Sequence, residues 1–444
     1  MKTHRFILLL LVFALVAAAC GDSSTDPTSP DSTVSPTSPT TVPDPTSVPF
    51  TQGELIALDL PRSSGDVTPE ELARVVAGDS ALGLALLAEL AGGDNYMISP
   101  YSIATALSML HPGARGTTAE EISNVLNLDV DPATLYEARA FIDAALAEQP
   151  EPVPDDDRAP FTIRPANSAW GQGGFPFNEA YLEVLATNFG AGMRVADFVA
   201  DPAGSTETIN SWVEDITEDR IQDLIPPGVI TVDTRLVLAN AIWFKANWFE
   251  PFDPEATSPG DFTLLDGSTV TVPLMHSSMR GQYVATDRYE AVRLGYAGDA
   301  AMVIMLPAEG TTPLELAATL TADDLRPQFG AFELQLTMPK FEFETDAPLK
   351  AALQSLGMVE AFTDSADLSG ITDATNLFVQ DALHKSFIAL DENGTEAAAA
   401  TALIVGLTSA PPPAEFTADR PFLFWIEHSS TGEMLFLGQV TDPS

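Results

Sequence analysis

One segment near the C-terminal end limits the possible folds more than any other. Residues 391–396 read Asp-Glu-Asn-Gly-Thr-Glu, and the alanine-rich run 397–402 follows them directly. Both lie between two strand-like stretches, Ser386–Leu390 and Pro421–Ile426. Alanine normally favours a helix, and that interpretation remains open for this run.

The same run also satisfies the two-residue period of a β-strand. Read in this way, one face is uncharged and holds Thr395, Ala397, Ala399, Thr401, Leu403 and Val405. Glu396 falls on the opposite face, so a slip of one residue would bury its charge. The segment could therefore enter the middle of a sheet, although it lies where a surface loop is expected.

The rest of the chain predicts an α+β fold. Apolar residues recur at helical spacing after the N-cap signal Thr68-Pro69-Glu70-Glu71, and further helices are expected at Ser102–Leu110 and Thr118–Leu126. Later stretches read as strands, namely Arg235–Phe244, Ala301–Leu306, Phe332–Leu336 and Phe341–Glu344. Helices early in the chain and long strands late in it indicate an α+β domain.

The N-terminus has the pattern of an export signal. Lys2 and Arg5 precede the apolar run Phe6–Val16, and three alanines lead to Cys20, the single cysteine of the chain. This arrangement resembles the cleavage box of bacterial lipoproteins, in which the cysteine is lipidated; plain secretion is the alternative. We expect a signal peptide at 1–19, a lipidated Cys20 with a disordered Ser/Thr/Pro-rich tether at 20–67, and one folded domain at 68–444.

Composition excludes several classes of partner. The chain carries 20 Lys and Arg against 63 Asp and Glu, a formal charge of −43. Such a surface repels phosphate backbones, so nucleic acid is not an expected partner. The excess of acid by itself indicates solubility and names no partner.

Residues for catalysis or metal binding are not apparent in the sequence. The five histidines form no His-x-x-x-His pair, so we expect no metal site and no cofactor. Gly78-Asp79-Ser80 superficially resembles the nucleophile motif of a lipase-like hydrolase family, but we expect Asp79 or Ser80 to cap a helix instead. The sequence contains neither a Gly-x-Ser-x-Gly elbow nor a phosphate-binding glycine loop.

Glu392–Ala399 is similar to the hinge of the reactive loop in the serpin family. Other segments match this family in the same order, namely residues 95–103, 113–118, 210–213, 236–245, 381–386 and 419–424. The matches run from about Thr68 to about Gln439, nearly the whole expected domain. An ordered set of this length is specific, whereas one such motif alone would be weak.

The resemblance implies the serpin fold and its mechanism. That fold has a large central mixed β-sheet of five strands, two smaller sheets, eight or nine helices and an exposed reactive loop. Inhibitory members act as suicide substrates: a protease attacks a bait bond in the loop, the cleaved loop inserts into the large sheet, and deacylation stalls. We therefore expect an inhibitor of extracellular serine proteases and not an enzyme.

By the same resemblance, the hinge residues are Glu392, Gly394, Thr395, Glu396, Ala397, Ala398, Ala399 and Ala400. Family spacing places the bait bond at Thr408-Ser409, with Leu407-Thr408 as the alternative. No Lys or Arg occurs between Gly394 and Glu415, which disfavours a trypsin-like target. Elastase-, subtilisin- or chymotrypsin-like proteases are the expected partners.

Five further residues match family positions that control the large sheet. Ser99, Ser102, Asn240 and His384 match the shutter, a polar cluster beneath the sheet, and Trp248 matches the breach, where the loop enters. An ordinary core role remains open for His384 and Trp248. No basic cluster suggests heparin binding.

The expected protein is a monomer on the extracellular side of a bacterial membrane, anchored through lipid on Cys20, or otherwise secreted. Two alternatives remain open. One is a non-inhibitory serpin that acts as a binding or chaperone-like protein, and the other is a substrate that is cut in the loop without trapping the protease.

Overall fold

Helices dominate the first half of the described chain and strands the second. The computed structural model describes residues 49–148, 161–373, 376–396 and 411–444, all within the compact unit Pro43–Ser444. The described residues form eight α-helices: α1 (Pro69–Leu90), α2 (Pro100–Leu110), α3 (Gly116–Val125), α4 (Pro132–Ala147), α5 (Glu179–Phe189), α6 (Pro202–Ile216), α7 (Pro313–Ala317) and α8 (Leu349–Ser355). Two 3-10 turns, His111–Gly113 and Glu360–Phe362, complete the helical part. Within these ranges, no helix has both the length and the apolar character needed to cross a membrane.

Local signals set the start of α1. The Thr68 side chain accepts a hydrogen bond from the Glu71 N–H, and the Glu71 carboxylate bonds back to the Thr68 N–H. Pro69 occupies the first helical position, where no N–H is required. The helix therefore begins at the residue that the sequence predicts.

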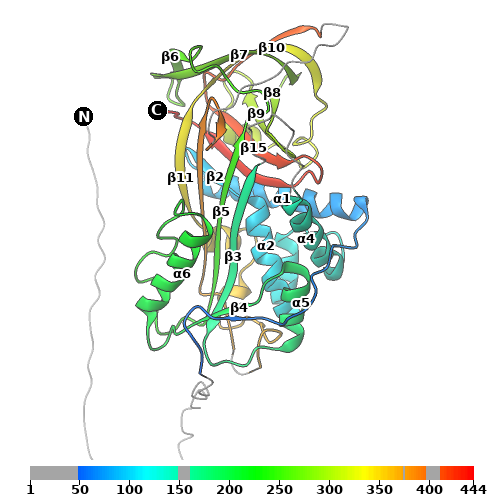
Figure 1. Ribbon diagram of the computed structural model, residues 1–444, viewed down its shortest axis with the longest axis vertical. Coiled ribbons are helices and arrows are strands. Elements are labelled where there is room, and N and C mark those ends of the chain that lie inside the picture. Colours follow the sequence, from blue (N-terminus) through cyan, green and yellow to red (C-terminus); the bar gives the residue numbers. More distant parts are fainter. Residues whose placement is uncertain (1–48, 149–160, 374–375, 397–410) are drawn as a thin grey trace, which may run out of the picture. The chain divides into compact units, whose positions relative to one another are not determined.

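A seven-stranded mixed sheet, here called sheet A, forms the centre of the fold. Its strands are, in spatial order, β1 (Leu55–Ile56), β4 (Met193–Ala196), β3 (Thr162–Gln172), β5 (Leu236–Asn247), β13 (Gly394–Thr395), β12 (Asp381–Asp391) and β11 (Phe341–Pro348). Figure 1 shows α6 on one face of this sheet and α2, α4 and α5 on the other. The face that carries α6 is called the outer face below.

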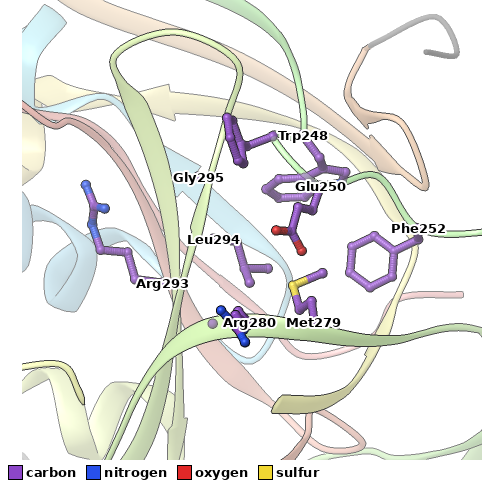
Figure 2. Close-up of a pocket in the computed structure, with 10 residues that line it drawn as sticks. Trp248, Glu250, Phe252, Met279, Arg280, Arg293, Leu294 and Gly295 are labelled. Carbon is purple, nitrogen blue, oxygen red and sulfur yellow. The ribbon is translucent and has the colours of Figure 1, made fainter. Parts of the chain in front are cut away.

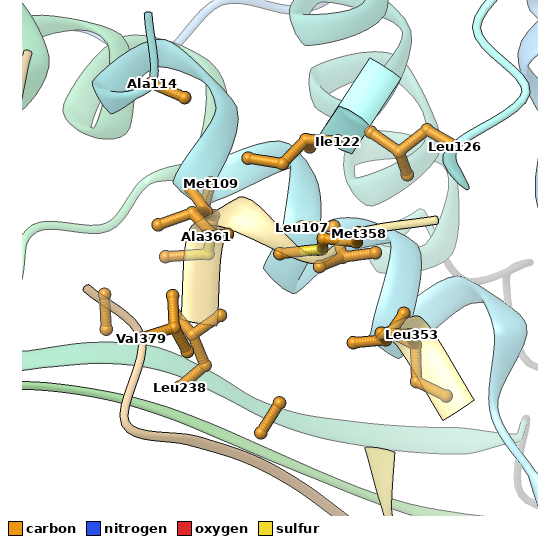
Figure 3. Close-up of a cluster of buried hydrophobic side chains, with 14 of the residues drawn as sticks. Leu107, Met109, Ala114, Ile122, Leu126, Leu238, Leu353, Met358, Ala361 and Val379 are labelled. Atoms are coloured by element: carbon orange, nitrogen blue, oxygen red, sulfur yellow. The ribbon is translucent and has the colours of Figure 1, made fainter. Parts of the chain in front are cut away.

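Alternate side chains of β5 are buried on opposite faces of sheet A. Leu238 belongs to the large core under α2, whereas Ala239 packs in the cluster under α6. Figure 3 shows Leu238 beside Leu107 and Met109 of α2 and Met358 from a distant segment. Because both faces are covered, β5 reads as a near-continuous apolar run.

A second sheet of nine strands, sheet B, packs at one end of sheet A. Its order is β14 (Pro413–Thr417), β10 (Gly330–Pro339), β7 (Thr269–Ala285), β8 (Tyr289–Gly295), β9 (Ala300–Pro307), β15 (Phe422–His428), β16 (Met434–Val440) and β2 (Tyr96–Ile98), with β6 (Ser258–Thr263) paired to β7. All eight residues of β9 are buried, as expected for a central strand covered on both faces.

The sheets differ from the expectation of five strands and two smaller sheets. Sheet A gains β1 from the N-terminal segment and β13 from the hinge. The two smaller sheets are continuous, because the long strand β7 pairs with β10 along one part and with β8 along another. The combination of helices and large sheets agrees with the expected α+β class.

The predicted disordered tether extended to residue 67, but residues 49–67 lie against the domain. Leu55 and Ile56 pair antiparallel with β4, and the Gln52 side chain bonds to Ser205 and to the Asp197 N–H. The tether prediction is therefore wrong for this segment, because its few apolar and hydrogen-bonding residues find partners on the domain surface.

Asp79 does not cap a helix, and neither does Ser80; both lie inside the uninterrupted helix α1. Asp79 is 1% exposed and accepts two hydrogen bonds of 2.6 Å from Arg139 of α4. The buried guanidinium compensates its charge. This partner lies 60 residues away, so no local pattern indicated it.

Candidate functional site

The hinge segment inserts as a short strand at one end of sheet A. Gly394 and Thr395 pair antiparallel with Asn247 and Ala246 of β5 on one side and with β12 on the other. Beyond β13, β5 and β12 pair directly and in parallel, from Val237 with Asp381 to Ile242 with Ser386. At the hinge end, β5 and β12 are therefore separated by β13, whereas further along sheet A they pair directly with each other.

Glycine is required at position 394. Its φ is +146°, and a Cβ placed there would lie 2.0 Å from the backbone oxygen of Ala246. The preceding turn is tightened by the Asp391 carboxylate, which accepts hydrogen bonds from the N–H groups of Asn393 and Gly394 at 2.7 and 3.3 Å. The chain can therefore reverse from β12 into β13 within two residues.

Glu392 anchors this turn to the body of the protein. Its carboxylate lies 2.8 and 3.0 Å from Lys340 Nζ and accepts a 2.7 Å hydrogen bond from Thr257. Burial alone would raise the pKa of Glu392, but the hydrogen bonds from Lys340 and Thr257 together hold it below its usual value. The carboxylate is therefore ionised and bound in the native state.

Trp248 contacts the hinge directly through a hydrogen bond and indirectly through an aromatic stack. Its indole N–H donates to the Asp391 carbonyl at 3.0 Å, and its ring stacks on Tyr296 with centroids 4.5 Å apart. Tyr296 in turn lies 2.8 Å from the Thr395 hydroxyl, and Thr395 is only 1% exposed. Trp248 is thus a buried aromatic residue that also contacts the hinge.

A small cavity of about 60 Å³ borders Trp248 on the side of sheet B. Figure 2 shows Glu250 among Phe252, Met279 and Arg280 in its lining. Burial raises the pKa of Glu250, and the charge of Arg280 partly offsets that effect. The cavity is too small for a drug-sized ligand.

The four predicted shutter residues lie together where β5 and β12 pair directly. Asn240 and His384 belong to these two strands, and Ser99 and Ser102 lie at the start of α2. His384 Nε2 accepts from the Ser99 N–H at 3.0 Å, so its proton lies on Nδ1, which donates to Asn240 Oδ1. The Asn240 amide donates to Ser102 Oγ at 2.9 Å and to Asn167 Oδ1 at 2.7 Å. Ser102 also donates to Asn167, at 2.6 Å.

This network is satisfied and uncharged. Burial lowers the pKa of His384 to about 3, so the ring is neutral at physiological pH. His384 and Asn240 are opposite each other in the parallel β5–β12 pair. The network therefore joins the two strands at the point where an inserting strand would have to separate them.

Some predicted residues fall outside the described ranges. These are Cys20, Ala397, Ala398, Ala399, Ala400, Leu407, Thr408 and Ser409. Glu396, the last described residue before this gap, accepts from Trp243 Nε1 and pairs with Arg220.

Several residues that hold the hinge or complete the shutter network were not predicted from the sequence. Arg220, Trp243, Thr257, Tyr296 and Lys340 contact the hinge. Asn167 belongs to the shutter network. Each comes from a segment distant in sequence, and none belongs to a spacing pattern that would single it out.

Comparison with known proteins identifies the family. The family model described as "Serpin (serine protease inhibitor)" matches residues 77–443. An uncharacterized serpin-like protein of Thermococcus kodakarensis is 37% identical over 86% of this chain and 89% of its own length. The leukocyte elastase inhibitor of Bos taurus is 34% identical over 79% of this chain and 93% of its own.

A solved structure confirms the expected serpin-like α+β fold. The native state of the thermophilic serpin tengpin has a TM-score of 0.77 and 26% identity, covering 88% of this chain and all of tengpin.

Proposed function

Because the chain belongs to the serpin family, whose members are generally protease inhibitors, we propose that it traps extracellular serine proteases by inserting its cleaved loop into sheet A. The protease serine Oγ attacks the carbonyl carbon of Thr408, forming an ester. The Thr408–Ser409 peptide bond breaks, and the amine of Ser409 leaves with the transferred proton. If Leu407–Thr408 is the bait bond, the same steps apply one residue earlier. Insertion then moves the ester-linked protease before water can hydrolyse the ester.

The observation that carries the proposal is the position of β13. It already pairs with β5 and β12 as the first two residues of a strand between them. The two registers agree with the β5–β12 register, so one continuous antiparallel strand fits between both neighbours. Continued downwards, this strand would put Thr401 between Asn240 and His384.

The same register assigns each following residue to a face. Residue 397 would lie opposite Ile388, and residue 399 opposite Ser386, two positions with exposures of 1% and 0% on the core side. Ala397 and Ala399 are small and uncharged, so they fit these positions without burying charge or excess volume. The hinge composition therefore suits insertion at these two buried positions.

The length of the segment is also sufficient for large displacement. A strand rises about 3.3 Å per residue, so the residues from Ala397 to Thr408 would span about 40 Å. That distance would carry a protease attached at Thr408 from the hinge towards the opposite end of sheet A.

The target preference follows from the bait residues. Thr408 and Leu407 are of medium size and uncharged, which suits elastase-, subtilisin- or chymotrypsin-like pockets. The bovine relative's name, leukocyte elastase inhibitor, supports the same class.

We further propose display on the extracellular side of a bacterial membrane through lipid on Cys20. Phe50 lies against Gly173, two residues beyond Gly171 of β3, which pairs with Leu236 at the start of β5. β13 pairs with Ala246 and Asn247 at the other end, about 30 Å away along the strand. Phe50 and the hinge therefore lie at opposite ends of sheet A, as expected if the reactive loop faces away from the membrane.

The test is incubation of the purified full chain in detergent with elastase, subtilisin, chymotrypsin and trypsin, followed by denaturing gels. A covalent band with one of the first three, and a cut mapped by mass spectrometry near Thr408, is the expected result. Cleavage in the loop by every protease without a covalent band would reject trapping and favour a substrate-like relative. An uncut, unreactive loop would favour a non-inhibitory binding role.

A further inference from the structure

Glu396 directly follows β13 and is the last residue of the hinge that the structure describes. Its backbone N–H still donates to the Ala389 carbonyl of β12 at 2.9 Å, but its φ is +51°. A residue with a side chain is strained in this left-handed region and would prefer the strand conformation. Contacts of the side chain must therefore compensate for the backbone strain.

Two contacts hold the Glu396 carboxylate on the outer face. Trp243 of β5 donates its indole N–H to Oε2 at 2.7 Å, and Arg220 Nε lies 3.3 Å from the same oxygen. The Glu396 side chain is 6% exposed although it is charged, whereas Arg220 is 49% exposed. The indole bond to the buried carboxylate is accordingly the stronger of the two contacts.

Both partners lie on the path of an inserting strand. Extending the β13 register puts residue 398 opposite Trp243. Arg220 belongs to the segment that follows α6, and Lys385 of β12 holds that segment through a 2.9 Å bond to the Gln222 carbonyl. The Glu396 side chain thus ties the hinge to the strand and to the covering segment beside which insertion must proceed.

We propose that Glu396, Trp243 and Arg220 form a latch that keeps the loop out of sheet A and sets the rate of its insertion. Release requires the carboxylate to separate from Trp243 and Arg220 and the Glu396 backbone to rotate from the left-handed to the strand conformation. The Glu396 N–H keeps its place in the ladder throughout. This proposal rests on the proposed inhibitory function, because the latch would regulate the insertion step of protease trapping. Its three members are positioning residues, because they act on the hinge and take no part in breaking the bait bond.

Breaking the latch should speed insertion by destabilising the uninserted state. We expect Glu396→Ala to raise the rate by about ten-fold, as for a hydrogen bond to a charged group. Arg220→Gln should raise the insertion rate by about three-fold, because the Arg220–Glu396 pair is half exposed. Arg220→Lys keeps the positive charge, so its rate should lie close to that of the unchanged chain. Glu396→Gln keeps an acceptor for Trp243 and should lie between the values for Glu396→Ala and Arg220→Gln.

A glycine variant separates the backbone contribution from the side chain. Glu396→Gly removes the same carboxylate as Glu396→Ala but also removes the strain at φ +51°. It should therefore insert more slowly than Glu396→Ala. This order reports the backbone strain at position 396 separately from the carboxylate contacts, which both variants lack.

The test measures conversion of the intact full chain to a heat-resistant form during incubation at a series of raised temperatures, without any protease. Arg280→Gln is the matched control, since Arg280 and Glu333 form an exposed pair of similar geometry, 3.2 Å apart, on sheet B. Where the intact chain converts too slowly, the same variants are compared by the rate at which heat resistance appears after subtilisin cuts the loop.

Rates for Glu396→Ala and Arg220→Gln equal to that of Arg280→Gln, in both measurements, would overturn the latch. Equal rates for Glu396→Ala and Glu396→Gly would show that backbone strain at Glu396 does not contribute to the insertion rate. If the variants change the conversion rate but no protease is ever trapped, the latch stands and the proposed inhibitory function fails.

Discussion

Lys340 Nζ lies 2.8 Å from Glu392 Oε2 and holds the start of the hinge against the body of the protein. The Glu392 side chain is 7% exposed and that of Lys340 is 34% exposed. Removing the ammonium group would leave a nearly buried carboxylate that keeps its hydrogen bonds from Thr257 and from its own backbone N–H but loses the charge of Lys340. The pair therefore links native stability to the position of the hinge.

Lys340→Ala should lower the free energy of unfolding by about 2 kcal/mol, less than for a fully buried pair because Lys340 is partly solvated. Urea unfolding followed by circular dichroism measures this change. Arg280→Ala, which breaks the exposed pair with Glu333, should cost no more than about 0.5 kcal/mol. Equal losses in the two variants would show that Glu392 is not anchored as described.

His384 should make the fold sensitive to acid. Burial lowers the pKa of His384 to about 3, whereas a histidine in the unfolded chain titrates near 6.5. The unfolded state then binds more protons, so the contribution of His384 is fully present above about pH 6.5 and is lost as the pH falls towards 3.

The measurement compares urea midpoints of the unchanged chain and His384→Gln between pH 7 and pH 4. The difference between the two proteins should shrink by up to about 1.4 kcal/mol for each pH unit below 6.5. His276→Gln is the control, because His276 hydrogen-bonds at the surface to Ser258. A difference that does not change with pH would contradict a neutral, buried His384.

Glu433 should make the fold sensitive to alkali. It is fully buried, and burial, together with the charge of Asp79, raises its pKa, an effect that Arg139 and Arg326 only partly offset. A raised pKa in the folded state contributes stability that is fully present below about pH 4.5 and is lost as the pH rises through the folded value.

Glu433→Gln removes that titration while keeping the shape of the side chain. Its stability relative to the unchanged chain should therefore increase between pH 5 and pH 9, as measured by urea unfolding. Glu309→Gln, at an exposed position, should show no such trend. A parallel pH dependence for Glu433→Gln and the unchanged chain would mean that Glu433 is ionised in the native core.

The face assignment of the inserted loop can be tested with one matched pair of variants. Continued register places residue 399 on the core side opposite Ser386, and residue 398 on the outer face opposite Phe387. Ala399→Glu should abolish the covalent complex and the gain in heat resistance after cleavage, because insertion would bury a charge. Ala398→Glu should retain both, and the opposite order would show that the strand inserts one residue out of register.

Local patterns predicted much of the fold. The capping residues Thr68 and Glu71 mark the start of α1, and the apolar run Arg235–Phe244 corresponds to the doubly covered strand β5. These signals lie within one turn or one strand, where spacing alone carries the information. The family resemblance added the hinge and shutter positions, which no periodicity would have distinguished from loop or core.

Long-range partners could not be predicted in this way. Lys340 lies 52 residues from Glu392, and Trp243 lies 153 residues from Glu396. Such pairs depend on how distant elements meet, and a lone lysine or tryptophan carries no spacing that announces its partner. The docking of residues 49–67 could not be predicted for the same reason, because Leu55 and Ile56 pair with the distant strand β4.

We propose above all that the cleaved loop becomes a strand between β5 and β12. Thermal unfolding of the full chain before and after subtilisin cuts the loop near Thr408 tests it most directly. Each added ladder hydrogen bond contributes about 1 kcal/mol, so the unfolding temperature should rise by roughly 10 °C or more after the cut. An unfolding temperature that stays the same or falls after cleavage would contradict loop insertion.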